Sequence, residues 1–397
     1  GLFDLLELKT YDSRARTRGS AGGEASPLLA LVPYDEAAEE ILGPYPPDAH
    51  AALLGKLRDA GCLGVFLALR FQTDDDDAIP WPDVGIPVYV IRPYTRVHEA
   101  GRTGVPWVGG AATLPGYVSG AKPIVSFSRL VASASDGFYR RSQAHVAYGF
   151  ARDPQHSLEV QFAAAALGVD ADTIPLPTDA RGAVMIPALP DGLPVVSAYD
   201  VMVGAPTALQ GRWAVVGFDG TQDAARMRTP FGPSTAYQAR AAVVNGILTS
   251  GLTPPRGRLA TAILFLAWAG VFVAVGFAFR ARVSGTGTLA LSVAAAVTGH
   301  VCLAYALIPT VWLPIVSPIV GMVLTGVAWV LSMNGARATL AERRAMQAER
   351  EAAFGVMSAQ VRHEVRNLLN SVRAPAEMVR NNFSRGDPLG LAEDHDE

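Results

Sequence analysis

Three long apolar stretches without a charged side chain constrain this chain more than any other feature of its sequence. They follow one another closely, at residues 259–279, 289–308 and 311–333. At a rise of about 1.5 Å per residue, a helix of about 20 residues crosses a hydrocarbon core of about 30 Å. Buried helices of soluble proteins rarely run so far without a charge, so the sequence predicts three transmembrane helices.

The overall composition agrees with a chain that lies partly in lipid. Half of the 397 residues are hydrophobic and only 17% are charged, whereas about 25% are charged in an average soluble domain. The formal net charge of −3 argues against a nucleic-acid-binding protein, which would carry a basic stripe. Cys62 and Cys302 fall on either side of the predicted membrane boundary, which excludes a disulfide framework and a zinc site built on cysteines.

Arginines next to the apolar stretches predict the orientation of the chain, because basic residues concentrate on the cytoplasmic side. The first loop and the segment after the third stretch contain five arginines: Arg280, Arg282, Arg337, Arg343 and Arg344. Arg256 and Arg258, before the first stretch, are the weaker opposing signal. We therefore expect a cytoplasmic C-terminus and an external N-terminal domain, exported by a further transmembrane helix upstream of Gly1.

Residues 1–255 show the pattern of an α/β domain, in which short apolar runs alternate with segments of helical periodicity. The runs typical of strands are 27–33, 63–69, 88–91 and 213–218. The segments typical of helices are 48–60, 156–167 and 236–248. This alternation predicts a mixed sheet with substantial parallel pairing and helical cover.

Residues 334–397 are polar and rich in strong helix formers. An apolar stripe with spacings of 4, 3, 4 and 7 residues follows the predicted helix, formed by Val361, Val365, Leu368, Val372 and Val379. Such a stripe is typical of a coiled-coil or bundle seam and needs burial, so we expect two copies of the chain to pair through it. Pro375 is expected to kink or end the helix.

The N-terminal domain resembles the type-two CHASE extracellular sensor domain of bacterial signalling receptors. The segments that carry the resemblance occur in the family's order: LELKTYDSRARTRG at 6–19, PLLALVPYDE at 27–36, GPYPPDAHAALLGKLRDAGCLGVFLAL at 43–69, DGFYRR at 136–141, IPLPTDARGAVMIP at 174–187, LPVVSAYDVMVGAPTALQGRWAVVGFDG at 193–220 and RTPFGPSTAYQARAAVVNGILTSG at 228–251. The resemblance implies an external domain that detects an unidentified stimulus and is followed by three membrane helices. It thus implies a multi-pass protein of the bacterial plasma membrane with a periplasmic or extracellular sensor.

A second, shorter resemblance lies on the predicted C-terminal helix. HEVRN at 363–367 is similar to the H-box of sensor histidine kinases. At about 100° per residue, His363 points away from the apolar stripe into solvent, where its neutral imidazole is accessible as a nucleophile. Glu364 is placed to orient the ring or accept its proton, and Asn367 lies on the same face.

The resemblance to sensor histidine kinases implies a role for each of these residues. His363 would accept the phosphoryl group, Glu364 would act as base, and Asn367 would have a conformational and phosphatase-related role. A second copy of the chain, a response regulator, an external stimulus and the lipid bilayer are the implied partners, with no nucleic acid.

Nucleotide-binding loops of the types G-x-x-x-x-G-K-[ST] and G-x-G-x-x-G do not occur in the sequence. We therefore expect ATP and Mg²⁺ to bind a catalytic domain outside this chain, and we predict no cofactor or metal site within it. Two other classes of function stay open. The same sensor can control an adenylate cyclase or a Ser/Thr kinase, or the chain can be a non-catalytic membrane interaction protein.

Four other polar features favour structural interpretations. His300 is expected to bond a neighbouring helix, and the acidic run Asp74–Asp77 is expected to be a solvated loop rather than a calcium site. Asp136 with Arg140 and Arg141 is expected to form a structural ion pair rather than an anion site. The glycosylation sequon at 382–384 falls in the predicted cytoplasmic part and is a chance match.

Overall fold

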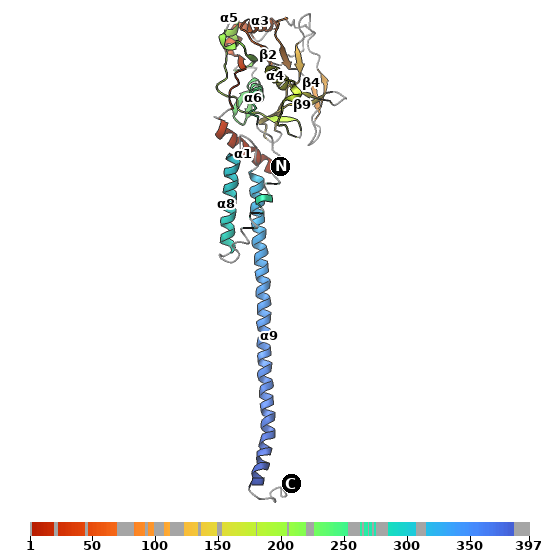
Figure 1. The fold of residues 1–397 in the computed structure, drawn as a ribbon, viewed down its shortest axis with the longest axis vertical. Coiled ribbons are helices and arrows are strands. Elements are labelled where there is room, and N and C mark those ends of the chain that lie inside the picture. Colours follow the sequence, from red (N-terminus) through yellow and green to blue (C-terminus); the bar gives the residue numbers. More distant parts are fainter. Residues whose placement is uncertain are drawn as a thin grey trace. The chain divides into compact units, whose positions relative to one another are not determined.

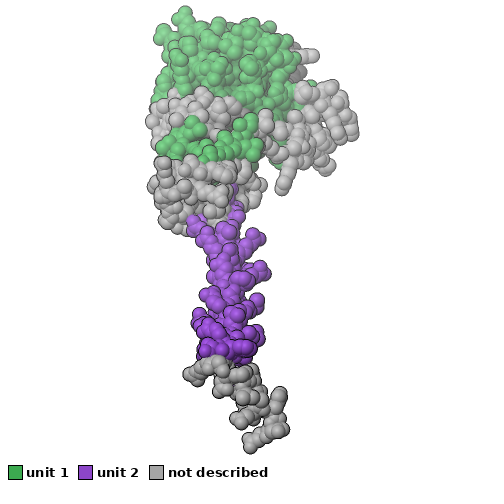
Figure 2. All heavy atoms as spheres, turned by 60° about the horizontal axis from the view of Figure 1, so that its bottom comes forward, with its two compact units in different colours: residues 1–323 green, residues 324–397 purple. Residues whose placement is uncertain are grey.

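The computed structural model divides into two compact units, Gly1–Val323 and Leu324–Glu397 (Figure 2). The structure describes residues 2–19, 23–43, 47–69, 83–91, 94–98, 107–111, 123–133, 136–148, 153–179, 181–204, 206–219, 226–252, 263, 266–268, 270–271, 274, 285–306 and 315–384. The elements can be followed in Figure 1.

A five-stranded parallel sheet forms the centre of the N-terminal domain. Its order is β1-β12-β2-β3-β6, and every neighbouring pair is parallel. The strands are β1 (Leu29–Tyr34), β12 (Trp213–Phe218), β2 (Gly64–Leu67), β3 (Val88–Ile91) and β6 (Ile124–Ser126). β1, β2 and β3 are buried along their whole length, as expected for a parallel sheet covered on both faces.

Alternate residues of the strands enter two separate hydrophobic clusters. Leu29 and Leu31 pack with residues of α4 (Leu158–Leu167) and α6 (Ala236–Leu248), whereas Ala30 and Val32 pack with residues of α3 (Pro47–Asp59) and α5 (Ala198–Val203). Because successive strand residues point to opposite faces, the sheet is covered by helices on both sides. The predicted α/β architecture is confirmed.

Three smaller sheets and four short or peripheral helices complete the described part of the domain. The other strands are β4 (Tyr94–His98), β5 (Trp107–Ala111), β7 (Leu130–Ala132), β8 (Tyr139–Gln143), β9 (His145–Tyr148), β10 (Asp153–His156), β11 (Ala183–Met185), β13 (Arg226–Thr229) and β14 (Gly232–Thr235). The other helices are α1 (Leu2–Gly19), α2 (Glu36–Leu42), η1 (Ala171–Thr173) and η2 (Thr207–Leu209). The strand orders of the three smaller sheets are β10-β9-β5-β4, β11-β8-β7 and β13-β14. The predicted mixed pairing thus occurs outside the central sheet, which is wholly parallel.

The predicted helix at 156–167 begins two residues later than the sequence pattern indicates. His156 ends strand β10, and Ser157 is the N-cap of α4 because its side-chain oxygen accepts a hydrogen bond from the backbone N–H of Val160. A serine hydroxyl at this position satisfies a backbone donor that the first helical turn leaves unpaired. Gly168 closes the helix in the left-handed conformation.

Gly217 in β12 lies where the packing leaves no room for a side chain. A Cβ atom at this position would collide with the side chain of Tyr237 in α6. We expect Gly217→Ala to lower the free energy of unfolding by about 1–3 kcal/mol, because overpacking forces neighbouring atoms to shift. Urea unfolding measures the loss. Gly55→Ala in α3 is the matched control, because no atom lies within 4 Å of its added Cβ, and an equal loss there would contradict the prediction.

The predicted membrane part is only partly described. Most of 259–279 lies outside the described residues. The second predicted stretch falls largely on α8 (Gly285–Ala306), whose apolar segment Val293–Ala304 is short of a full span. Among the described residues one helix is long and apolar enough to cross a membrane, Pro318–Asn381 within α9 (Val316–Ser384). The residues that the structure describes therefore support one candidate membrane helix, whereas the sequence predicts three.

Helix α9 continues through the second unit as far as Ser384. Pro375 lies inside it and does not end it, contrary to one of the two expectations for this residue. An ion pair between Arg373 Nε and Glu377 Oε1, at 2.6 Å, spans the turn around Pro375. Pairs of opposite charge four residues apart stabilise a helix, which offsets part of the backbone hydrogen bond that proline cannot make.

Candidate functional site

The three residues of the predicted phosphoacceptor site lie on the exposed surface of α9. His363, Glu364 and Asn367 are all exposed, and Asn367 Nδ2 lies 3.1 Å from His363 Nδ1. The predicted placement of His363 and Asn367 on one face is therefore confirmed. An asparagine amide donates through its nitrogen and accepts through its oxygen, so it can hold either neutral tautomer of the imidazole. Only the tautomer with the proton on Nδ1 leaves a lone pair on Nε2.

The apolar stripe of α9 is exposed along its whole length. Its side chains are between 46% exposed at Val379 and 67% exposed at Val372. An apolar row on an otherwise polar helix is typical of a face that packs against a partner helix. Pairing of two copies through this face stays a prediction.

A buried ion-pair cluster joins helix α1 to strand β8 in the first unit. The Arg140 guanidinium donates to both carboxylate oxygens of Asp12 at 2.8 and 2.6 Å and to both of Asp136 at 2.9 and 2.7 Å. The side chains of Arg140 and Asp12 are 2% and 1% exposed. Two bidentate pairs on one guanidinium fix its position strongly, so this cluster holds α1 against the sheet.

The electrostatics of this cluster favour the charged forms of Asp136 and Arg140. The hydrogen bond from Arg140 holds the pKa of Asp136 well below its usual range. Burial by itself lowers the pKa of Arg140, but the hydrogen bonds to Asp12 and Asp136 outweigh it and raise the pKa. Lys9 of α1 adds a further contact, 3.4 Å from Asp136 and 4.4 Å from the centre of the Phe138 ring.

The predicted structural ion pair is thus confirmed for Asp136 and Arg140 but not for Arg141. Arg141 Nη1 instead lies 3.3 Å from Asp179 Oδ2, because adjacent strand residues point to opposite faces. The sequence pattern missed Asp12 altogether. The only sequence feature that could have indicated a role for Asp12 is its place as the single acid within the basic stretch KTYDSRAR of α1.

Glu7 of α1 connects the sensor domain to the start of α9. Its Oε2 accepts a hydrogen bond of 2.8 Å from the backbone N–H of Ile315, the residue before α9. Glu7 is 1% exposed and Ile315 is 7% exposed. A carboxylate at a helix N-terminus satisfies an unpaired backbone donor and is favoured by the helix dipole. The first helix therefore contacts the N-terminal end of the candidate membrane helix directly.

His300 of α8 is buried and bonded, as the structural interpretation predicts. Trp268 Nε1 donates to His300 Nδ1 over 3.2 Å, and their rings are perpendicular to within 3° with centroids 6.2 Å apart. The bond joins a residue of the first predicted apolar stretch to one of the second.

A pair of histidines in the sensor domain predicts a pH-dependent stability. The His145 and His156 rings lie 4.8 Å apart, and His156 Nε2 is 2.6 Å from Asp172 Oδ1. Burial lowers the pKa of His145, the charge of His156 lowers it further, and Asp172 opposes the shift. The unfolded chain therefore binds a proton at His145 before the folded chain does.

We expect this pair to weaken the sensor domain at acid pH. Because the folded pKa of His145 is depressed, the stability that its neutral form contributes is complete above the unfolded pKa of about 6.5 and is lost as the pH falls below that value through the lower folded pKa. Urea unfolding of the purified chain at pH 7, 6 and 5, at constant ionic strength, measures the loss. His145→Asn is expected to make the decline with pH shallower. An unchanged decline would show that His145 does not contribute.

The remaining predictions have mixed outcomes. Asp74–Asp77 and the arginines of the first predicted loop lie outside the described residues. Both cysteines are free, and burial raises the pKa of the Cys62 thiol to about 12, which makes it unreactive. The sequon at 382–384 lies in the last turn of α9.

Comparison with known protein families finds one match, to the CHASE2 domain, over residues 1–278. The match covers the central sheet, α1 with the ion-pair cluster, and all but the last residue of the first predicted apolar stretch. Comparisons with curated proteins and with solved structures find no match.

Proposed function

Because this chain belongs to the CHASE2 family of extracellular sensor domains, we propose that it is the sensory and transmembrane part of a two-component sensor histidine kinase. CHASE2 domains occur in receptors such as histidine kinases and cyclases. The observation that favours the kinase is the hydrogen-bonded pair His363–Asn367 on an exposed face of α9, the helix that also contains the candidate membrane span. A cyclase needs no such histidine.

We place the chain in a bacterial plasma membrane with three spans, 259–279, 289–308 and 311–333. Two contacts support this arrangement. The Trp268–His300 bond pairs the first span with the second. The Glu7–Ile315 bond requires the sensor domain and the start of the third span to lie on the same side of the membrane. An external sensor and a cytoplasmic C-terminal helix satisfy both contacts and the distribution of arginines.

The signal then travels from α1 to α9. A stimulus at the sensor domain shifts α1, and Glu7 transmits the shift to the N-terminal end of α9. In the cytoplasm the exposed apolar stripes of two copies pair, and the shift moves the pair between two packing states. One state presents His363 for phosphorylation and the other does not.

The chemistry at His363 is a phosphoryl transfer from ATP, which would be bound with Mg²⁺ by a catalytic domain outside this chain. With the ring proton on Nδ1, the lone pair of Nε2 attacks the γ-phosphorus. The P–N bond forms, the bond from phosphorus to the bridging oxygen breaks, and ADP leaves. Glu364 accepts the proton from Nδ1, which keeps the phosphorylated ring neutral. The phosphoryl group then passes to an aspartate of a response regulator.

Phosphorylation of the full-length protein in membranes tests this proposal. Labelled ATP is expected to give an acid-labile, base-stable label on the protein, the behaviour of a phosphorylated histidine. If the same preparation makes cyclic AMP instead, or carries an acid-stable label on Ser or Thr, the sensor controls a cyclase or a Ser/Thr kinase. If it shows none of these activities, it is an interaction protein.

A further inference from the structure

The antiparallel strands β9 and β10 place two histidines side by side in the sensor domain. His145 and His156 are register partners, and the centroids of their rings lie 4.8 Å apart. Both residues are half-buried. Histidine is the side chain whose charge normally changes between pH 5 and pH 8. The pair is therefore a titratable cluster that the chemistry at His363 does not use.

Asp172 of η1 is the carboxylate that serves this pair, and it contacts one of the two rings. Its Oδ1 lies 2.6 Å from His156 Nε2, whereas His156 Nδ1 is buried and has no hydrogen-bond partner among the described residues. If both rings are protonated, Asp172 compensates one charge. The two imidazolium rings then repel each other over a short distance in partly buried surroundings.

The segment that precedes β11 packs against His145 from a second side. The backbone N–H of His145 donates to the carbonyl oxygen of Gly182 over 3.0 Å. The charged residues of this segment are Asp179, which pairs with Arg141, and Arg181, which has a partner of its own in the structure. Neither contributes to the pKa shift of His145.

The other neighbours of the pair add no charge that acts on His145. Strand β5, which pairs with β9, has the sequence WVGGA and contains no titratable residue. In α4, which follows His156, the acidic residue Glu159 is fully buried and bonded to Ser128. Besides burial, which has the largest effect, the charge of His156 lowers the pKa of His145 and Asp172 raises it.

A proton fits this pair better than a metal ion does. Structural zinc sites have four protein ligands and catalytic zinc sites have three. No group of three metal-binding side chains occurs in the part of the chain that the structure describes.

We propose that His145 and His156 form a proton-binding site through which the sensor domain responds to acid outside the cell. At neutral pH the rings lie together as the structure shows. In acid, protonation of both rings favours an arrangement in which β9 and β10 hold them farther apart, because that arrangement binds the second proton more tightly. The inference deepens the proposed sensory function and rests on it for what the response controls.

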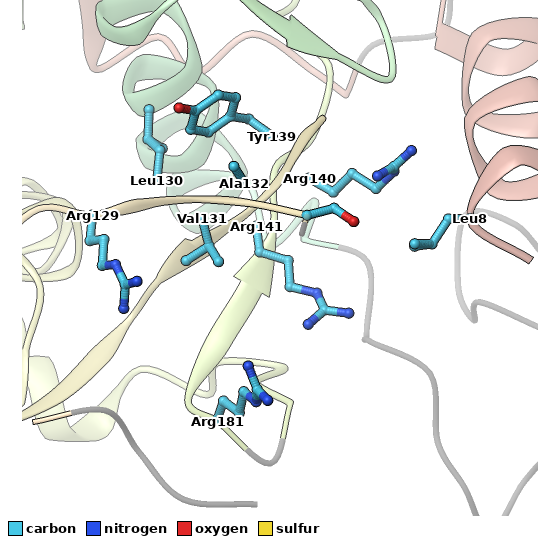
Figure 3. A pocket seen from close by; sticks show the side chains of 10 residues that line it. Leu8, Arg129, Leu130, Val131, Ala132, Tyr139, Arg140, Arg141 and Arg181 are labelled. Carbon is cyan, nitrogen blue, oxygen red and sulfur yellow. The ribbon is translucent and has the colours of Figure 1, made fainter. Parts of the chain in front are cut away.

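Strand β8 connects the pair to helix α1. The side chain of Gln143, the last residue of β8, donates from Nε2 to the backbone oxygen of His145 over 2.7 Å. Three residues earlier in β8, Arg140 bonds Asp12 of α1. Figure 3 shows Arg140 pointing toward the helix that carries Leu8. A displacement of His145 can therefore reach α1 through one strand.

The surroundings of α1 permit a shift. A cavity of about 600 Å³, lined by Leu8 of α1 and by residues of β7 and β8, lies beside the Arg140 contact (Figure 3). It leaves space into which the helix can move. Glu7, the neighbour of Leu8, bonds the residue before α9, so a shift of α1 changes the contact on which the proposed signal depends.

Hydrogen exchange of the purified full chain in lipid nanodiscs tests the proposal. Exchange is measured at pH 7 and pH 5 and corrected for the intrinsic pH dependence of amide exchange. The amides of α1 are expected to accelerate at pH 5 at least about fivefold more than those of β12 in the central sheet. Equal acceleration in α1 and β12 would show that acid only weakens the whole domain and would overturn the proposal.

Three variants make this test specific to the pair. His145→Asn is expected to abolish the difference between α1 and β12. Asp172→Asn should move the response to lower pH, because the carboxylate that favours protonation is gone. Asp200→Asn removes an exposed carboxylate of α5 whose charge does not act on His145, and this matched control should leave the response unchanged. Circular dichroism at pH 7 checks that each variant is folded.

A response that persists in the His145→Asn protein would also overturn the proposal. Hydrogen exchange needs no ATP, so its outcome does not depend on phosphorylation of His363. An exchange response in a protein that carries no label on His363 would support the proton site while the kinase assignment fails.

Discussion

Replacing His363 with glutamine is expected to abolish phosphorylation of the full-length protein by ATP. Glutamine keeps a similar size and a polar end but offers no nucleophilic ring nitrogen. His363 is exposed on α9, so the change leaves no buried group without a partner and the helix should remain folded. The acid-labile label should fall to background, a loss of at least 100-fold.

Two further variants of α9 make this result specific. Asn370 is an exposed residue one turn beyond the site. The control variant Asn370→Ala is therefore expected to leave labelling within twofold of wild type. Asn367→Ala removes the amide that lies 3.1 Å from Nδ1. It should reduce the rate because the imidazole ring loses the contact that orients it. Acid-labile label that persists in the His363→Gln protein would show that His363 is not the phosphoacceptor. It would then favour the cyclase and interaction-protein alternatives.

The second large effect is expected from Arg140→Met, which should lower the free energy of unfolding of the sensor domain by about 3–5 kcal/mol. Methionine fills a similar volume, but it leaves the Asp12 carboxylate, 1% exposed, without its charged partner. Removal of one member of a buried pair costs more than the pair itself contributes, because the remaining charge stays desolvated. Hydrogen exchange of the slowest amides in β8 and β12 measures the change.

Arg141→Met is the matched control for this experiment, because it removes the same charge from the next residue of the same strand. Its ion pair with Asp179 is partly exposed and 3.3 Å long, and pairs of that kind contribute about 0–1 kcal/mol. Equal losses in the two variants would show that the Arg140 cluster does not hold α1. Double replacement, Asp12→Asn with Arg140→Met, should recover part of the loss because the uncompensated carboxylate is gone.

Local patterns were sufficient for the elements of the sensor domain. The apolar runs at 88–91 and 213–218 coincide with β3 and β12, and the periodic segment at 236–248 coincides with α6. The H-box spacing placed Asn367 beside His363 because residues four apart lie on one helix face. Each of these inferences depends on a period of 2.0 or 3.6 residues, which a short window of sequence contains completely.

Local sequence patterns could not predict the contacts between segments that are far apart in the sequence. Arg140 and Asp12 are 128 positions apart, and Glu7 and Ile315 are 308 apart. Nothing in the neighbourhood of Asp12 in sequence distinguishes it from a solvated helix residue. Its role depends on where the chain brings β8, and that depends on the packing of the whole domain.

The sequence by itself therefore determined the α/β character of the sensor, the apolar character of residues 259–333 and the face of α9 that carries His363. Hydropathy and periodicity are local, and they are enough for each of these. Only the tertiary structure decided that Arg140 pairs with Asp12, that Arg141 pairs with Asp179, and that Glu7 bonds Ile315, the residue before α9. Each of these results joins charges that are close in space but far apart in sequence, where only the fold sets the distance on which their interaction depends.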